Sequence, residues 1–194
     1  MTFTWFMTVA MVALVTAVSP GPVNLLAMSA GVHQKMRSGL LFVLGATFGF
    51  CALLFMNGIG LQSLISQVPI IMQVIKWAGI GFIAWIVWKL WQSDGKLEGD
   101  TAFQPNFVKG ALLQWLNPKA WLVSVSVVGL YAPQDKTRLV TMTAIYFVIC
   151  FLSICCWLWA GKLLTYWRQT EKYLQYFNKG LAVILGVSLL YLLF

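Results

Sequence analysis

Charged residues are scarce in this sequence, and acidic residues are the scarcest of them. Asp and Glu account for five of the 194 residues, and all charged residues together for 9%, whereas a soluble domain carries about 25%. Hydrophobic residues make up 60% of the chain, and its mean hydropathy is +0.83. A chain with so few charges predicts an all-α polytopic membrane protein, for which the bilayer is the solvent.

The chain also lacks the residue patterns that hold metals or form disulfide frameworks. His33 is its one histidine, and no metal-type spacing joins it to the four cysteines, which all fall inside apolar runs: Cys51, Cys150, Cys155 and Cys156. We therefore expect no metal, no cofactor and cysteines that only fill space. An enzyme is also disfavoured, because no intramembrane histidine or acid stands ready to activate Ser19, Ser124 or Ser126.

Basic residues are absent from the start of the chain and separate the apolar runs further on. No Lys or Arg precedes the first apolar run, so the basic region of a cleavable signal peptide is missing and the first helix is expected to be retained. The net charge of +8 comes from residues between apolar runs and not from one soluble face. This pattern predicts topology signals and contacts with lipid headgroups, not nucleic-acid binding.

Six apolar runs are candidates for helices that cross the bilayer. They cover about residues 3–28, 39–61, 69–91, 107–130, 139–161 and 180–194. The last run is short, so it either includes residues 173–178 as well or lies in a thinned bilayer. The most polar stretch, residues 92–106, is the expected cytoplasmic linker between two halves, 1–91 and 107–194. Nine basic residues lie in the first, third and fifth loops and three on the other side, so the positive-inside rule places both termini outside the cytoplasm.

A helix break lies in the middle of the first apolar run. Residues 1–34 carry no charged side chain, yet they contain Ser19-Pro20-Gly21-Pro22. Each proline lacks an N–H group, and its ring clashes with the carbonyl one turn earlier. Inside a membrane such a break is tolerated only where the backbone faces protein or a watery cavity, so the break is a candidate site.

A second break follows at the corresponding place in the second half. Pro118 lies 98 residues after Pro20, and the expected second and fifth spans keep nearly the same offset. Each half then has three spans, of which the first is broken. Because three is an odd number, the two halves insert with opposite topology, as inverted repeats with broken first and fourth helices. Paired breaks in inverted halves indicate a transporter site near the bilayer midplane.

The chemistry of the breaks favours a carboxylate. A half-helix that begins at a break offers free N–H groups and a positive dipole end, to which Gly21, Val23 and Asn24 contribute but Pro22 does not. Asn24 and Asn117 add amides, and Gln114 is a further candidate lining residue. Lys119 either attracts an anion or extends its side chain to the interface, and the sequence supports both interpretations equally. With no acid inside a span, a zwitterion is held more easily than a strongly cationic substrate.

Glycines are spaced along the second span at Gly39, Gly45 and Gly49. A surface of small residues lets helices approach closely. It fits folding within one chain or a homodimer interface equally well.

At these positions the chain resembles the LysE/RhtB family of amino-acid exporters. The resemblance is carried by Ser19-Pro20-Gly21-Pro22-Val23-Asn24, by the three spaced glycines, and by Gly110 through Asn117-Pro118-Lys119-Ala120. It implies efflux of amino acids or their derivatives across the bacterial inner membrane, driven by the proton gradient. Many members carry an acid just after the second-span glycines, whereas Phe50 stands here, so small neutral substrates such as homoserine, threonine or cysteine-like compounds are favoured.

Two further interpretations compete with an exporter. A membrane thiol–disulfide carrier would need reactive cysteines beside the breaks, and none lies near Pro20 or Pro118 in the sequence. A structural or regulatory membrane subunit would explain the glycines, but not the matched breaks or the two asparagines beside them. The predicted site residues are therefore Pro20, Gly21, Pro22, Val23, Asn24, Gln114, Asn117, Pro118 and Lys119.

Overall fold

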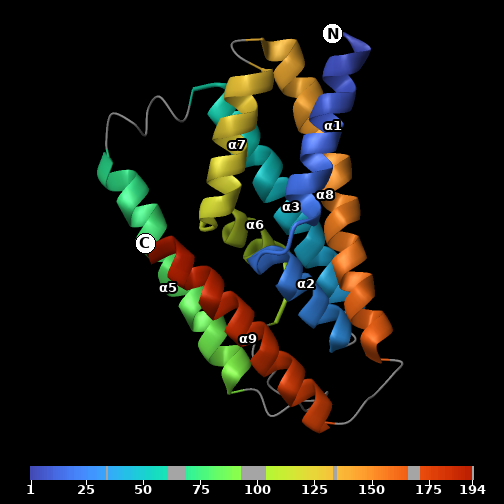
Figure 1. Cartoon of the computed structure of the whole chain (residues 1–194), viewed down its shortest axis with the longest axis vertical. Helices are drawn as coiled ribbons and strands as arrows, with labels where there is room; N and C mark the ends of the chain where they lie inside the picture. The colour runs from blue at the N-terminus through green and yellow to red at the C-terminus, as the bar shows by residue number, and fades with distance from the viewer. Residues whose placement is uncertain (34, 61–68, 93–103, 133–134, 166–170, 194) are drawn as a thin grey trace.

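The computed structural model describes residues 1–33, 35–60, 69–92, 104–132, 135–165 and 171–193. These residues form eight α-helices (Figure 1): α1 (Phe3–Val18), α2 (Pro22–Val32), α3 (Met36–Gly58), α5 (Pro69–Trp91), α6 (Phe107–Trp115), α7 (Pro118–Tyr131), α8 (Lys136–Thr165) and α9 (Glu171–Leu193). The all-helical prediction is confirmed for this part of the chain. Most of the predicted linker lies outside the described residues.

Both predicted breaks are present. Helix α1 ends at Val18 and α2 begins at Pro22, with a bend of 59° between them. Helix α6 ends at Trp115 and α7 begins at Pro118, with Asn117 as its N-cap. Pro22 and Pro118 each occupy the first turn of the helix that follows, where the missing N–H group costs nothing.

Three units among the described helices are long and apolar enough to cross a membrane. They are α3, α8, and the bent pair α1–α2 taken as one span. This supports a polytopic membrane protein, while the division into six spans stays a prediction. Helix α9 starts at Glu171, well before Gly180, so residues 173–178 are helical together with the run that follows them.

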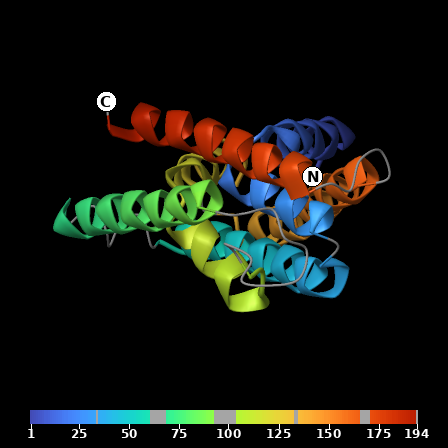
Figure 2. The ribbon, with the colours of Figure 1, turned by 90° about the horizontal axis from the view of Figure 1, so that it is seen from below.

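The helices form a bundle with a separate pair beside it. Helices α3 and α8 pack against each other in opposite directions, α6 and α7 pack on α3, and α1 and α2 pack on α8. Helices α5 and α9 lie side by side and flank the bundle, as the view from below also shows (Figure 2). Their described contacts with the bundle are mainly those of α9 with α2 and of α5 with α6.

Close helix contacts depend on glycines that face backbone. A Cβ atom on Gly45 would lie 1.9 Å from the Phe107 carbonyl oxygen, and one on Gly110 would lie 2.2 Å from that of Phe42. Gly31 and Gly161 make the same kind of reciprocal contact between α2 and α8. Predicted packing residues Gly39 and Gly49 face the Leu158 side chain and the Ala111 backbone, so all three second-span glycines lie against other helices.

Two apolar clusters fill the interior, one on each side of the breaks. The first joins α2, α3, α6 and α8 to α5 and α9, and it includes Leu26, Phe42 and Leu158. The second joins α1, α3, α7 and α8, and it includes Leu53, Trp121 and Met142. Polar side chains of the two breaks lie between these clusters.

Candidate functional site

A cavity lies where the two breaks meet. The space between its lining residues, including the part open to solvent, is about 470 Å³. Six of the predicted site residues line it: Gly21, Val23, Asn24, Gln114, Asn117 and Lys119. The three prolines do not. Pro20 is exposed, and Pro22 and Pro118 open the helices that follow.

Lys119 joins the two breaks directly. Its Nζ atom donates to the Ser19 Oγ atom over 2.6 Å and to the Ser19 carbonyl oxygen over 3.1 Å, although the residues are 100 positions apart. The side chain is half-buried, and its ammonium group points to the first break. Within the described part of the chain, no carboxylate lies in ion-pair distance of this ammonium group.

The carbonyl groups that end α1 all have partners. Asn24 Nδ2 donates to the Ala17 and Ser19 carbonyl oxygens over 2.8 and 2.9 Å. Trp157 Nε1 donates to the Val18 carbonyl oxygen over 3.0 Å. The side-chain amino group of Asn24 therefore stabilises the break. Of the two donors predicted at Asn24, only the backbone N–H group is left for a ligand.

The N–H groups that begin α2 are free in the described structure. Leu25 N donates to the Gly21 carbonyl oxygen over 3.0 Å and closes the first helical turn. No hydrogen bond among the described residues uses the N–H groups of Gly21, Val23 or Asn24. The Lys119 Nζ atom is 3.6 Å from where a Cβ atom on Gly21 would lie, so the ammonium stands at this helix end.

The second break has a different role, because its donors are already engaged. Asn117 Oδ1 accepts from the Lys119 N–H over 3.1 Å, and Trp121 Nε1 donates to the Trp115 carbonyl oxygen over 2.7 Å. The Gln114 side chain is buried and lines the cavity, yet it makes no hydrogen bond to any described residue. The second break thus contributes the Lys119 ammonium group and the free Gln114 amide to the cavity, and not the N–H groups of a second helix start.

The remaining wall is apolar and aromatic. The rings of Phe50 and Tyr146 lie 5.4 Å apart at 39°, and Val123, Cys150 and Ile154 complete this wall. Sequence reasoning did not identify Tyr146, Cys150 or Ile154, although their spacing of four residues places them on one face of a helix. No cysteine lies beside the breaks in the sequence. In the folded chain, however, Cys150 lines the cavity between them.

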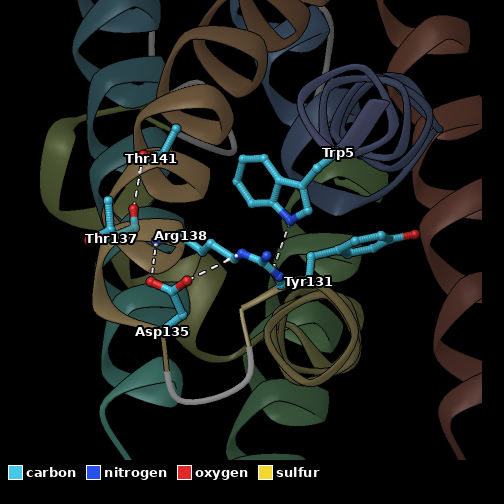
Figure 3. A network of polar contacts seen from close by, with 6 residues as sticks. All are labelled: Trp5, Tyr131, Asp135, Thr137, Arg138 and Thr141. Carbon is cyan, nitrogen blue, oxygen red and sulfur yellow. Dashed lines mark hydrogen bonds and ion pairs between the residues drawn. The ribbon is translucent and has the colours of Figure 1, made fainter. Parts of the chain in front are cut away.

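Polar contacts join helices at the end where α1 begins and α7 ends. Trp5 Nε1 donates to the Tyr131 carbonyl oxygen over 2.9 Å, and Asp135 pairs with Arg138 over 3.2 Å at the start of α8 (Figure 3). Nearby, Asn57 Nδ2 of α3 donates to the Ser124 Oγ atom of α7 over 2.5 Å. No group of histidines, cysteines and acids in the described residues has the arrangement of a metal site.

Comparison with known proteins adds a family match. The family model described as LysE type translocator matches residues 14–193. The "Cysteine/O-acetylserine efflux protein" of Escherichia coli strain K12 is 28% identical over 182 residues, which is 92% of this chain and 90% of the relative. Proteins of the same name from Shigella flexneri and Escherichia coli O1:K1 / APEC are 28% and 27% identical with the same coverage. No solved structure matches significantly.

Proposed function

The chain belongs to the LysE type translocator family, and we propose that it is a secondary transporter that exports a small neutral α-amino acid or derivative from bacteria. The substrate class includes homoserine, threonine and cysteine-like compounds. The relatives named as cysteine/O-acetylserine efflux proteins support this size and charge. The protein lies in the inner membrane, with the more basic loops in the cytoplasm and both termini in the periplasm.

The observation that carries this proposal is the positive charge of Lys119 at the free start of α2. An ammonium group in an apolar protein is costly without a counter-ion, and the positive end of a helix adds to the cost. The described residues supply no carboxylate there. A substrate carboxylate would accept from the ammonium and from the free N–H groups of Gly21, Val23 and Asn24 at once.

The α-ammonium group of an amino-acid substrate needs a partner other than Lys119. The Gln114 amide lines the same cavity without a described hydrogen bond, so its oxygen is available to a substrate ammonium group. The aromatic face of Phe50 adds a second favourable surface for a cation. These groups are neutral, which fits an α-ammonium group already balanced by its own carboxylate.

The cavity wall also accounts for a neutral substrate side chain. No acid lines the cavity in the described structure, and Phe50, Val123 and Ile154 are apolar. A cationic side chain would lie near Lys119 without a counter-charge. A short neutral side chain instead packs against this wall.

Alternating access follows from two inverted halves, residues 1–91 and 107–194. The broken span of the first half, α1–α2, packs on α8 of the second half, and the broken span α6–α7 packs on α3 of the first. This reciprocal packing supports a pseudo-twofold relation with the site at its centre. Rocking of the halves around the Lys119–Ser19 contact would expose the cavity to each side in turn, driven by the proton gradient.

Export is tested in cells that lack or overproduce the protein. The cells are loaded with single dipeptides, and extracellular amino acids are measured over time. We expect overproduction to raise efflux of one or a few small neutral amino acids and deletion to raise their internal level. Unchanged efflux of every amino acid would overturn the proposal.

A further inference from the structure

We propose that Tyr146 selects the substrate side chain, by donating its hydroxyl hydrogen to an acceptor atom on that side chain. The inference rests on the proposed export of a neutral amino acid, and it narrows the class. Side chains with a hydroxyl or acyl-ester oxygen close to the α-carbon are preferred to hydrocarbon side chains of similar size.

The first observation is a buried hydroxyl group in the cavity wall. Tyr146 lies on α8, is 1% exposed and lines the cavity with Lys119 and Gln114. Its hydroxyl oxygen is buried and makes no hydrogen bond to any described residue. Native proteins pair nearly all such groups, so an unpaired one beside a ligand cavity indicates a partner that comes with the ligand.

The neighbouring hydroxyl group of Thr16 cannot donate to Tyr146, but its oxygen can accept from it. Thr16 lines the same cavity, and its Oγ1 atom donates to the Val12 carbonyl oxygen over 2.8 Å and lies 3.2 Å from that of Ala13. The proton of Thr16 is therefore engaged with its own helix. The oxygen of Thr16 keeps a lone pair close to the Tyr146 hydroxyl, so a substrate oxygen competes with it for the Tyr146 proton.

The ring that carries this hydroxyl is fixed by its packing. Tyr146 belongs to the buried cluster that joins α1, α3, α7 and α8, and its ring is 5.4 Å from that of Phe50. A fixed ring holds the hydroxyl in one place, which is what discrimination between substrates requires. Phe50 supplies the apolar part of the same wall. Among the described lining residues, Tyr146 supplies the one phenolic hydroxyl.

The selectivity arises from an unpaired polar group. A substrate oxygen satisfies the hydroxyl, whereas a methyl group in its place leaves the hydroxyl buried and unpaired. A neutral hydrogen bond of this kind corresponds to a preference of about three- to tenfold. Carboxylate and ammonium contacts at Lys119 and Gln114 are the same for both substrates, so they do not contribute to the ratio.

The test compares substrate pairs that differ at one position. Purified protein in liposomes is assayed for exchange of labelled serine, with unlabelled threonine, valine, serine and alanine as competitors. We expect threonine to compete about three- to tenfold better than valine, and serine better than alanine. In Tyr146→Phe both ratios should approach one, while the matched control Tyr131→Phe, outside the cavity lining, should keep them.

A second measurement addresses the fold of the variant. Because the Tyr146 hydroxyl has no partner to lose in the described structure, Tyr146→Phe should unfold at the same or a higher temperature in detergent. A clearly lower unfolding temperature, or a variant that does not fold, would show that the hydroxyl is bonded within the protein, and this would overturn the inference.

The outcomes separate the two proposals. If wild-type liposomes exchange no amino acid, the proposed function fails and this inference fails with it. If the wild type exchanges serine but Tyr146→Phe keeps the wild-type ratios, the inference alone fails. A wild-type protein with no preference for threonine over valine would overturn it as well.

Discussion

At the scale of single residues, Lys119 has the most direct link to function. Its ammonium group bridges to Ser19 across the cavity and has no carboxylate near it in the described structure. The sequence placed Lys119 at the second break but left two roles open for it. The choice between them depends on a contact over 100 residues of sequence, which single-sequence patterns do not contain.

Replacing Lys119 should weaken substrate binding strongly. Removing one partner of a buried charged contact costs about 2–5 kcal/mol, so Lys119→Met should raise the half-saturating substrate concentration by about 30-fold or more. Lys119→Arg keeps the charge but not the geometry and should show an intermediate value. Exchange kinetics in liposomes measure both variants, and equal kinetics of Lys119→Met and wild type would contradict the carboxylate role.

His33 makes the stability of the protein depend on pH. It lies between α2 and α3, where its Nδ1 atom is 2.8 Å from the Ser29 carbonyl oxygen and its Nε2 atom is 3.3 Å from Asn178 Nδ2 of α9. Burial, aided by the charge of Lys35, lowers the pKa of His33 below its ordinary value of 6.5.

Acid should therefore destabilise the wild type through His33. The unfolded chain takes up a proton as the pH falls below about 6.5, whereas the folded chain resists protonation, so stability is complete above that pH and decreases below it. Thermal unfolding in detergent should show a smaller loss for His33→Gln than for wild type between about pH 7.5 and pH 5.5. Equal losses in the two proteins would assign the acid sensitivity to other groups.

At the scale of elements, the glycine contacts decide which helices can pack together. A Cβ atom on Gly45 would meet the Phe107 carbonyl oxygen, whereas one on Gly129 would meet nothing within 4 Å. Gly45→Ala should separate α3 from α6 and cost about 1–3 kcal/mol, and Gly129→Ala should be nearly neutral. Unfolding temperatures in detergent compare the two, and equal temperatures would contradict this packing.

The first break tests whether the start of α2 binds substrate. Pro20→Ala with Pro22→Ala restores two N–H groups and favours a continuous helix through residues 3–32. The free N–H groups of Val23 and Asn24 would then pair within that helix. We expect transport to be lost while the protein still inserts, measured by exchange and by the amount of protein in the membrane. Normal transport by the double variant would rule out the helix end as the site.

Much of this element-level structure could be predicted from the sequence. Pro20, Pro22 and Pro118 locate the breaks because proline restricts the local backbone, and the cavity does lie between them. The sequence could not show that the breaks are unequal. That difference arises because Asn117 caps α7 with its own side chain, while Asn24 turns back to the end of α1. Both residues are asparagines close to a break, and their contacts show the different roles.

At the scale of the whole molecule, the two halves meet around one cavity. Each broken span packs against a helix of the other half, and the α5–α9 pair flanks the bundle (Figures 1 and 2). The wall residues Tyr146, Cys150 and Ile154 come from α8, far in sequence from the first break. Such contacts depend on how the halves fold onto each other, so sequence spacing within a half does not reveal them.

The most direct test of the central claim is whether the purified protein needs a free substrate carboxylate. Liposomes that contain the protein are assayed for exchange of a small neutral amino acid in competition with the same amino acid, its amide and its methyl ester. The account predicts that only the free amino acid competes effectively, and that Lys119→Met removes this advantage. Equal competition by the amide or the ester would contradict the assignment of Lys119 and the start of α2 as the carboxylate site.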